Sequence, residues 1–118
     1  MLRTPADFAA LSGAPSVATR RLGIRHRTDA ARAVDPTAPR LRIGIATSRK
    51  VGGAVVRNRI RCRLKAIVHE LAPLVRPGSD ILFGVRTAAA GATTAELRAD
   101  VQECLRRAHL LHDGEAAR

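Results

Sequence analysis

Polar and apolar residues alternate with a period of two along residues 16–28 and 41–48, the pattern of strands with one buried face. The alternation is clearest in the second stretch, whereas in the first it is irregular near Arg20 and Arg21. Residues 80–86 are apolar enough for a central strand, and the prolines within residues 29–40 predict a loop. The pattern therefore predicts three strands.

A period near 3.6 predicts three helices. Residues 6–13 form a short one, and residues 54–72 form a long one that Pro73 ends. The third begins after Thr93, which has capping-box spacing with Glu96. Its buried stripe comprises Leu97, Val101, Cys104, Leu105 and Ala108.

The resulting order is α-β-β-α-β-α, which predicts an α/β fold with helices packed on a sheet. The 118 residues have the length of a single domain, 1–118, and we expect residues 110–118 to be a frayed tail. Phe8 and Phe83 are the only aromatic residues, so the core must be built from Leu, Ile, Val and Ala.

The formal net charge of +11 is concentrated in one part of the chain. Fourteen Arg and Lys residues lie between Arg20 and Lys65 with only Asp29 and Asp35 as acids, whereas the rest is close to neutral. A local positive field of this size indicates a polyanion as partner, and nucleic acid is the first candidate.

The helix predicted at 54–72 carries much of this charge. Its apolar stripe comprises Val56, Ile60, Leu64, Ile67 and Leu71. Its cationic flanks comprise Arg57, Arg61 and Lys65 on one side and Arg59 and Arg63 on the other. Like charges four residues apart destabilise a helix, and no acid occurs in it before Glu70. We therefore expect an external anion as counter-charge, with a merely solvated basic face as the alternative.

Gly52 and Gly53 precede this helix, beside Arg49 and Lys50. Free N–H groups and the helix dipole favour an anion at such a helix start. Glycines also serve ordinary turns, so the pair alone does not identify a phosphate site.

The stretch IGIATSRKVGGAVVRNRIRCRLKAIVHEL strongly resembles the bacterial ribonuclease P protein subunit. In that family a Lys and a loop lead into a basic helix through an A-V-x-R-N-R sequence. The matching residues here are Lys50, Ala54, Val55, Arg57, Asn58, Arg59, Arg63 and Leu64. ADF near the N-terminus, SVATR in the first strand and DILFGVR after the helix also follow in the family's order. The resemblance covers most of the chain.

The resemblance implies an α+β sandwich, similar to a domain shared by a ribosomal protein and elongation factor G. Its mixed sheet would contain a left-handed β-α-β crossover around the basic helix, against the usual handedness. The implied partners are ribonuclease P RNA and precursor tRNA. The RNA would remove the 5′ leader by Mg²⁺-dependent hydrolysis and would itself hold most of the Mg²⁺. The protein subunit would contribute no catalytic residue and would bind no small-molecule substrate.

Matched residue by residue, the resemblance gives two sets of site residues. The RNA-docking set comprises Arg49, Lys50, Arg57, Asn58, Arg59, Arg61, Arg63 and Lys65. The set expected to line a cleft for the single-stranded leader comprises Phe8, Arg20, Arg25, Ser48 and Arg86. Phe8 would stack on a leader base, with a core position as the alternative. Cys62 departs from the family's pattern at a position that is usually basic.

Two other functions stay open. A general or ribosome-associated RNA-binding protein of related fold would have the same charge but would not support catalysis by ribonuclease P RNA. A protein-only nuclease would need a pair of metal-binding acids, and Asp29, Asp35 and His26 lack that spacing.

Three further expectations concern metal, redox state and compartment. Cys104, His109 and His112 offer three ligands where structural zinc takes four, so we expect no protein metal site. No stretch reaches 18 apolar residues, and the N-terminus is a poor secretory signal. We therefore expect a cytoplasmic protein with free thiols and no membrane association.

Overall fold

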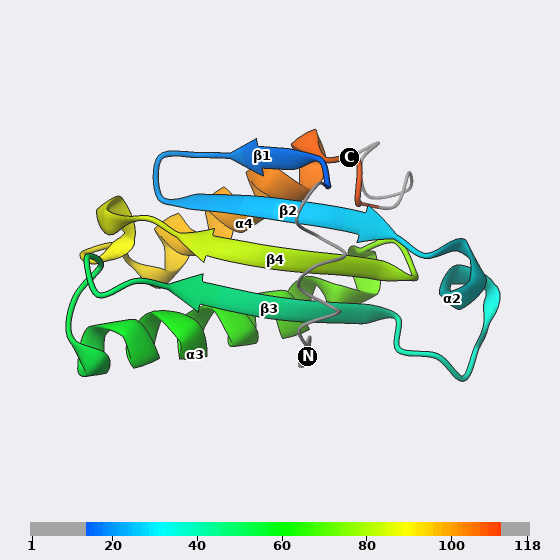
Figure 1. Cartoon of the computed structure of the whole chain (residues 1–118), viewed down its shortest axis with the longest axis horizontal. Coiled ribbons are helices and arrows are strands. Elements are labelled where there is room, and N and C mark those ends of the chain that lie inside the picture. Colours follow the sequence, from blue (N-terminus) through cyan, green and yellow to red (C-terminus); the bar gives the residue numbers. More distant parts are fainter. Residues whose placement is uncertain (1–13, 112–118) are drawn as a thin grey trace.

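The computed structural model describes residues 14–111. Its strands are β1 (Ser16–Ala18), β2 (Leu22–Thr28), β3 (Leu41–Thr47) and β4 (Ser79–Val85). They form one sheet in the order β1-β2-β4-β3 (Figure 1). β4 pairs antiparallel with β2 and parallel with β3, so the sheet is mixed as expected.

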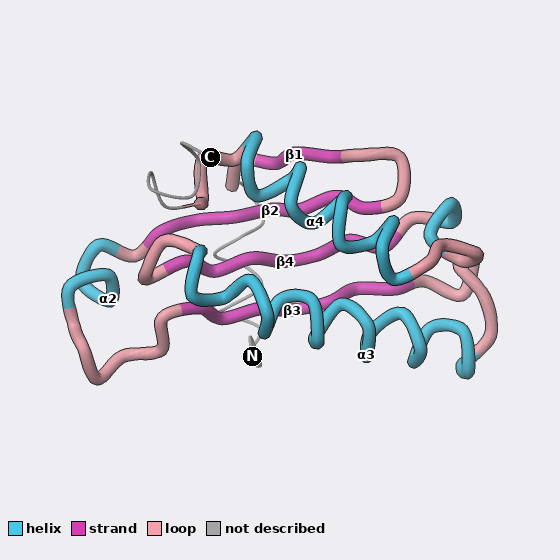
Figure 2. The backbone as a smooth tube through the Cα atoms, turned by 180° about the vertical axis from the view of Figure 1, so that it is seen from behind, coloured by secondary structure: helices cyan, strands magenta, loops and turns pink. Residues whose placement is uncertain are grey.

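Two long helices cover one face of this sheet, α3 (Ala54–Leu71) and α4 (Thr94–Arg107), as Figure 2 shows. Two 3-10 turns, η1 (Ala72–Leu74) and η2 (Thr87–Ala89), follow α3 and β4 respectively. Among residues 14–111, no helix covers the opposite face, which is the one seen in Figure 1 and which we call the open face.

The core lies between the two helices and the sheet. Phe83 and Ile81 of β4 are buried there, as are Leu22 and Ile24 of β2. The buried residues of α4 are those predicted from its period, Leu97, Val101, Cys104 and Leu105, with Ala108 packed partly against them. The capping box of Thr93 and Glu96 is present with both of its hydrogen bonds, which fixes the start of α4.

β3, α3 and β4 form a β-α-β unit of unusual hand. When Figure 2 is turned so that β3 and β4 point upward, α3 lies in front of the sheet and β4 lies to the left of β3. The crossover is therefore left-handed, an exception to the strong preference for right-handed connections.

The strand predicted over residues 16–28 is wrong as a single element. The chain turns at Arg20 and Arg21, and β1 and β2 pair as an antiparallel hairpin. The Thr19 side chain stabilises the turn, because its Oγ1 accepts a hydrogen bond of 3.3 Å from the Leu22 N–H. The irregular alternation near Arg20 and Arg21 marked this turn.

The loop predicted over residues 29–40 contains a short helix, α2 (Ala30–Val34). The Asp29 side chain caps it by accepting hydrogen bonds from the N–H groups of Ala31 and Arg32, at 3.0 and 3.3 Å. The other predicted elements of the described region agree with the structure to within one residue.

Both ends of the described region bear on earlier expectations. Leu110 and Leu111 fall in the predicted tail, yet Leu110 is buried and Leu111 forms a β-bridge with Val75. The helix predicted over residues 6–13 and the remainder of the tail, 112–118, lie outside the described residues.

Candidate nucleic-acid interface

The basic helix α3 is seated on the sheet by the apolar stripe that its sequence predicts. Its buried residues are Ile60, Leu64, Ile67, Val68 and Leu71, and Val56 packs against them from the first turn. Gly52, in the loop before α3, has a φ of 158°, and a Cβ there would lie 2.9 Å from the Val56 Cβ. The loop therefore requires glycine here, because its backbone passes close to the first turn of α3.

Most cations of the predicted docking set have no counter-charge within the described part of the chain. The side chains that make neither an ion pair nor a hydrogen bond with another of residues 14–111 are those of Arg49, Lys50, Arg57, Arg59, Arg61 and Lys65. Arg63 differs, because its Nη1 donates a hydrogen bond of 3.1 Å to the Ala92 carbonyl. Glu70, the first acid of the helix, is 2.8 Å from Arg98 of α4.

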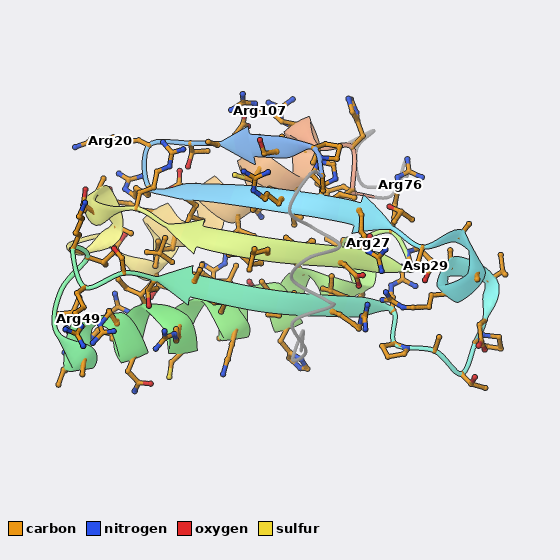
Figure 3. All side chains as sticks on the ribbon, viewed as in Figure 1. Arg20, Arg27, Asp29, Arg49, Arg76 and Arg107 are labelled. Carbon is orange, nitrogen blue, oxygen red and sulfur yellow. The ribbon has the colours of Figure 1, made fainter. Side chains whose placement is uncertain are left out.

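These cations gather at one end of the molecule. α3 and α4 both begin at that end, so the positive ends of both helix dipoles lie there (Figures 1 and 2). Figure 3 shows Arg49 and Arg20 at the same end, while Arg27 and Arg76 lie toward the opposite one. The fold thus gives this end a positive field beyond that of the side chains alone.

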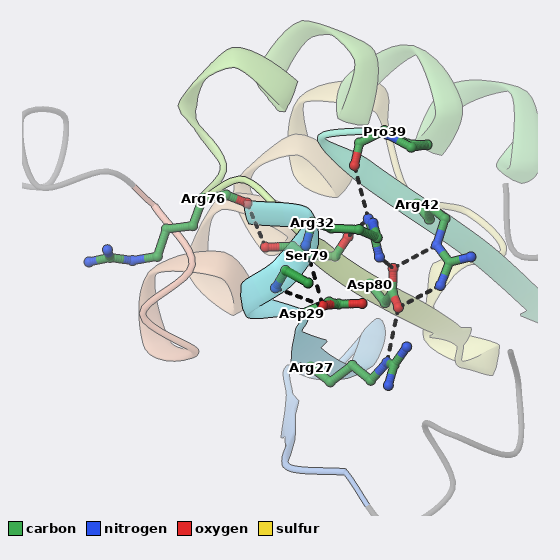
Figure 4. Close-up of polar contacts among 9 residues, drawn as sticks. Arg27, Asp29, Arg32, Pro39, Arg42, Arg76, Ser79 and Asp80 are labelled. Carbon is green, nitrogen blue, oxygen red and sulfur yellow. Dashed lines mark hydrogen bonds and ion pairs between the residues drawn. The ribbon is translucent and has the colours of Figure 1, made fainter. Parts of the chain in front are cut away.

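Part of the predicted basic cluster serves another purpose, which sequence reasoning missed. Asp80 is 1% exposed and is bound by three arginines from three elements: Arg27 of β2, Arg32 of α2 and Arg42 of β3 (Figure 4). Arg21 is also engaged, by Glu96 at 2.8 Å. Asp80 is the one acid in a strand that is otherwise apolar after Ser79, which was the available signal.

Two opposing effects act on the pKa of Asp80. Burial of the carboxylate raises its pKa, while hydrogen bonds from Arg42, Arg32 and Arg27 together lower it more, to about 2. Asp80 is therefore ionised at neutral pH and balances part of the positive charge around it. The three arginines around Asp80 are therefore engaged within the fold, unlike most cations of α3 and of the loop before it.

The open face has a hollow of about 340 Å³ over β1, β2 and β4. Its floor is low because Gly23, Gly84 and Ala46, which have little or no side chain, stand side by side on adjacent strands. Arg25 and Arg86 from the predicted cleft set both line it. Two cationic side chains therefore border a hollow in which a nucleotide base or a polynucleotide backbone can come close to the strands.

The other members of the cleft set lie elsewhere. Arg20 is exposed in the β1–β2 turn, and Ser48 is exposed just beyond β3, and neither lines the hollow. Phe8 lies outside the described residues. Cys62 is exposed on α3, and Cys104 is buried, so these two thiols are free as expected.

Within residues 14–111, no three His, Cys, Asp or Glu side chains come together in a way that could hold a metal ion. His112, one of the three ligands considered from the sequence, lies outside this range. No helix in the same range is long and apolar enough to cross a membrane.

Comparison with known proteins gives one consistent family. The family model described as Ribonuclease P matches residues 1–109. The ribonuclease P protein component of Lactiplantibacillus plantarum is 37% identical over 76 residues, which are 64% of this chain and 67% of that protein. The component from Roseiflexus is 42% identical over 76 residues, 64% of this chain and 62% of its own.

Solved structures share the fold. The RNase P protein of Staphylococcus aureus superposes with a TM-score of 0.79 at 23% identity, covering 93% of this chain and 95% of its own. That of Thermotoga maritima gives 0.75 at 21% identity, covering 90% and 94%. At such identities the structural likeness establishes the fold alone, and the family is established by the match of the family model to residues 1–109. The chain thus belongs to the ribonuclease P protein family.

Proposed function

We propose that this chain is the protein subunit of ribonuclease P, which docks on the catalytic RNA through α3 and binds the 5′ leader of precursor tRNA on the open face. Membership of the ribonuclease P protein family supports the proposal that this chain is a subunit of a ribonucleoprotein. The observation that carries the docking surface is the row of α3 cations without a counter-charge in the described chain. A phosphate backbone supplies that charge.

The docking surface suits a structured RNA. Arg59 and Lys65 are exposed, whereas Arg57 and Arg61 are partly buried. The partly buried guanidinium groups have less conformational freedom to lose when they bind RNA. Arginine binds phosphate through paired hydrogen bonds, and each neutralised phosphate releases counterions. Affinity should therefore fall steeply with salt.

The hollow on the open face suits a single strand. Arg25 and Arg86 would bind its phosphates, and the low floor of Gly23 and Gly84 would admit a base or ribose. α3 covers the opposite face of the same sheet. One small domain can therefore hold the catalytic RNA on one side and the leader on the other.

In this proposal the RNA performs the hydrolysis. Mg²⁺ would be held mainly by RNA phosphates, since phosphate oxygens are ligands that it prefers. The protein's own contribution is positive charge and a surface for the leader, both of which raise the local concentration of substrate near the RNA.

The test is cleavage of precursor tRNA at low Mg²⁺ with a bacterial ribonuclease P RNA, this protein, or both. Cleavage that requires both components is the expected result. Tight binding of the RNA without any gain in cleavage would instead favour a general RNA-binding protein. Cleavage by the protein alone would indicate a protein-only nuclease.

A further inference from the structure

A second hollow, of about 350 Å³, lies between the N-terminal half of α3 and the segment that leads into α4. One wall is a face of α3 and includes Arg59 and Arg63. The other wall is residues 90–94, which end in the first residue of α4. Both helices begin at the cationic end of the molecule (Figure 2), and the residues that line the hollow include the first turns of α3 and the first residue of α4.

The charged side chains that line this hollow are Arg59 and Arg63, so its charge is positive. No acid lines it, and Arg59 is exposed without an ion pair to any of residues 14–111. Arg63 spends one of its five N–H donors on the Ala92 carbonyl, which fixes its guanidinium at the edge of the hollow. Glu96, the acid closest in sequence, is turned to Arg21 and the Thr93 N–H.

The backbone of the second wall adds donors. In the described structure, the N–H groups of Thr94 and Ala95 have no acceptor, because the Thr93 side chain binds the N–H of Glu96 instead. Such groups at the start of a helix of 14 residues favour a negative ligand next to the arginines.

We propose that this hollow binds a backbone phosphate of the RNA that docks on α3, so that the RNA interface continues from the basic helix onto residues 91–94. The inference rests on the proposed function and deepens it. Arg59 and Arg63 provide the charge, the start of α4 provides backbone donors, and the partly exposed side chain of Val56 provides an apolar surface for ribose.

Gly91 allows a direct test. It is exposed, and a Cβ built on it meets nothing within 4 Å, so side chains can be introduced without disturbing the fold. Gly91→Glu places a negative charge at the hollow, Gly91→Lys a positive one, and Gly91→Gln reports the steric effect alone. Gln102→Glu makes the same change in net charge as Gly91→Glu, on an exposed site toward the other end of α4.

The measurement is the equilibrium affinity of each folded variant for a bacterial ribonuclease P RNA over a range of salt concentrations. Gly91→Glu should bind about tenfold more weakly than Gly91→Gln, with a shallower salt dependence, and Gly91→Lys should bind more tightly. Gln102→Glu should bind like the unchanged protein.

Equal affinities for the three Gly91 variants, with normal binding by the unchanged protein, would overturn the phosphate site and leave the proposed function intact. Failure of the unchanged protein to bind the RNA would overturn both. A loss in Gln102→Glu as large as in Gly91→Glu would show a general charge effect and would also reject the site.

Discussion

Arg42 of β3 stands opposite Asp80 of β4 in the parallel ladder and grips both of its carboxylate oxygens, with Nε and Nη2 each donating a hydrogen bond of 2.9 Å. Arg27 stands opposite the same residue on the β2 side, with its Nε 3.0 Å from the carboxylate. One buried carboxylate therefore ties three neighbouring strands together. The positive charge of Arg27 and Arg42 alone would suggest that they bind nucleic acid, but in the fold they stabilise the sheet.

Replacing Asp80 should destabilise the fold strongly. Asp80→Asn keeps the shape but leaves three guanidinium groups around a neutral side chain, and breaking such a buried network costs about 3–5 kcal/mol. Urea unfolding measures this loss. Asp35→Asn is the matched control, because the Asp35 carboxylate is exposed and accepts a hydrogen bond only within its own turn, from Thr37, so a small loss is expected. Equal losses in the two variants would contradict the structural role of the network.

Stability should also depend on acid through Asp80. Its pKa of about 2 in the folded state lies below its ordinary value of 3.8, so its contribution is complete above pH 3.8 and is lost as the pH falls toward 2. Urea unfolding measured across this interval should show the loss. Asp80→Asn should have a flatter acid profile there; an unchanged slope would assign the acid sensitivity to other carboxylates.

His26 should produce a separate effect at higher pH. Burial lowers the pKa of its imidazole below the ordinary value of 6.5, so the unfolded chain takes up the proton more readily. Stability should therefore decrease as the pH falls through 6.5. His26→Gln should lack this step in unfolding curves measured between pH 8 and 5, whereas persistence of the step would exclude His26 as its source.

Arg59→Ala should weaken RNA docking without weakening the fold. The side chain is exposed and projects off the buried stripe, so the melting temperature should stay within about 3 °C. Affinity for ribonuclease P RNA should fall about tenfold, and the slope of affinity against salt should decrease by about one phosphate contact. Arg106→Ala removes the same charge from the far end of α4 and should bind normally. A similar loss in both variants would argue against a localised interface.

Gly84→Val should fill the hollow on the open face. The position is in an extended strand, where a Cβ would meet only the Gly23 carbonyl, at 3.9 Å, so the fold should be maintained. Binding of leader-bearing precursor tRNA by the assembled enzyme should weaken about tenfold, equivalent to about 1.4 kcal/mol. Binding of leaderless tRNA is the internal control. An equal effect on both would place the leader elsewhere.

The two thiols should differ sharply in reactivity. Cys62 is exposed on α3, whereas Cys104 is fully buried, and burial raises the pKa of its thiol. A thiol reagent should therefore modify one cysteine in the native protein and the second only after unfolding. Bound ribonuclease P RNA should slow modification of Cys62. Modification at the same rate with and without RNA would move the docked RNA away from this part of α3.

Features with a local cause were predictable from the sequence. The α3 stripe follows from its period, and the start of α4 follows from the four residues of its capping box. The hairpin turn was missed because Arg20 and Arg21 lack the Gly, Pro or Asn that usually marks a turn, and the Thr19 side chain does this work instead.

Features that depend on distant residues were not predictable. The arginines that surround Asp80 come from three separate elements, and nothing local to Arg27 or Arg42 distinguishes them from the cations of α3. The hollow beside Arg63 likewise exists because residues 90–94 return to α3 through the fold. The amount of positive charge can be predicted from the sequence, but the topology determines which arginines are paired within the fold and which are left for an external anion.

The central position of β4 has a consequence for how the chain is made. β4 joins β2 to β3 by pairing Leu22 with Val85 on one side and Thr47 with Val85 on the other. During synthesis β2, β3 and the whole of α3 emerge before the strand that unites them. The basic helix thus leaves the ribosome without the sheet that will seat it, and such non-local pairing slows folding. Completion of the sheet and seating of the basic helix are therefore the same late event in the folding of the nascent chain.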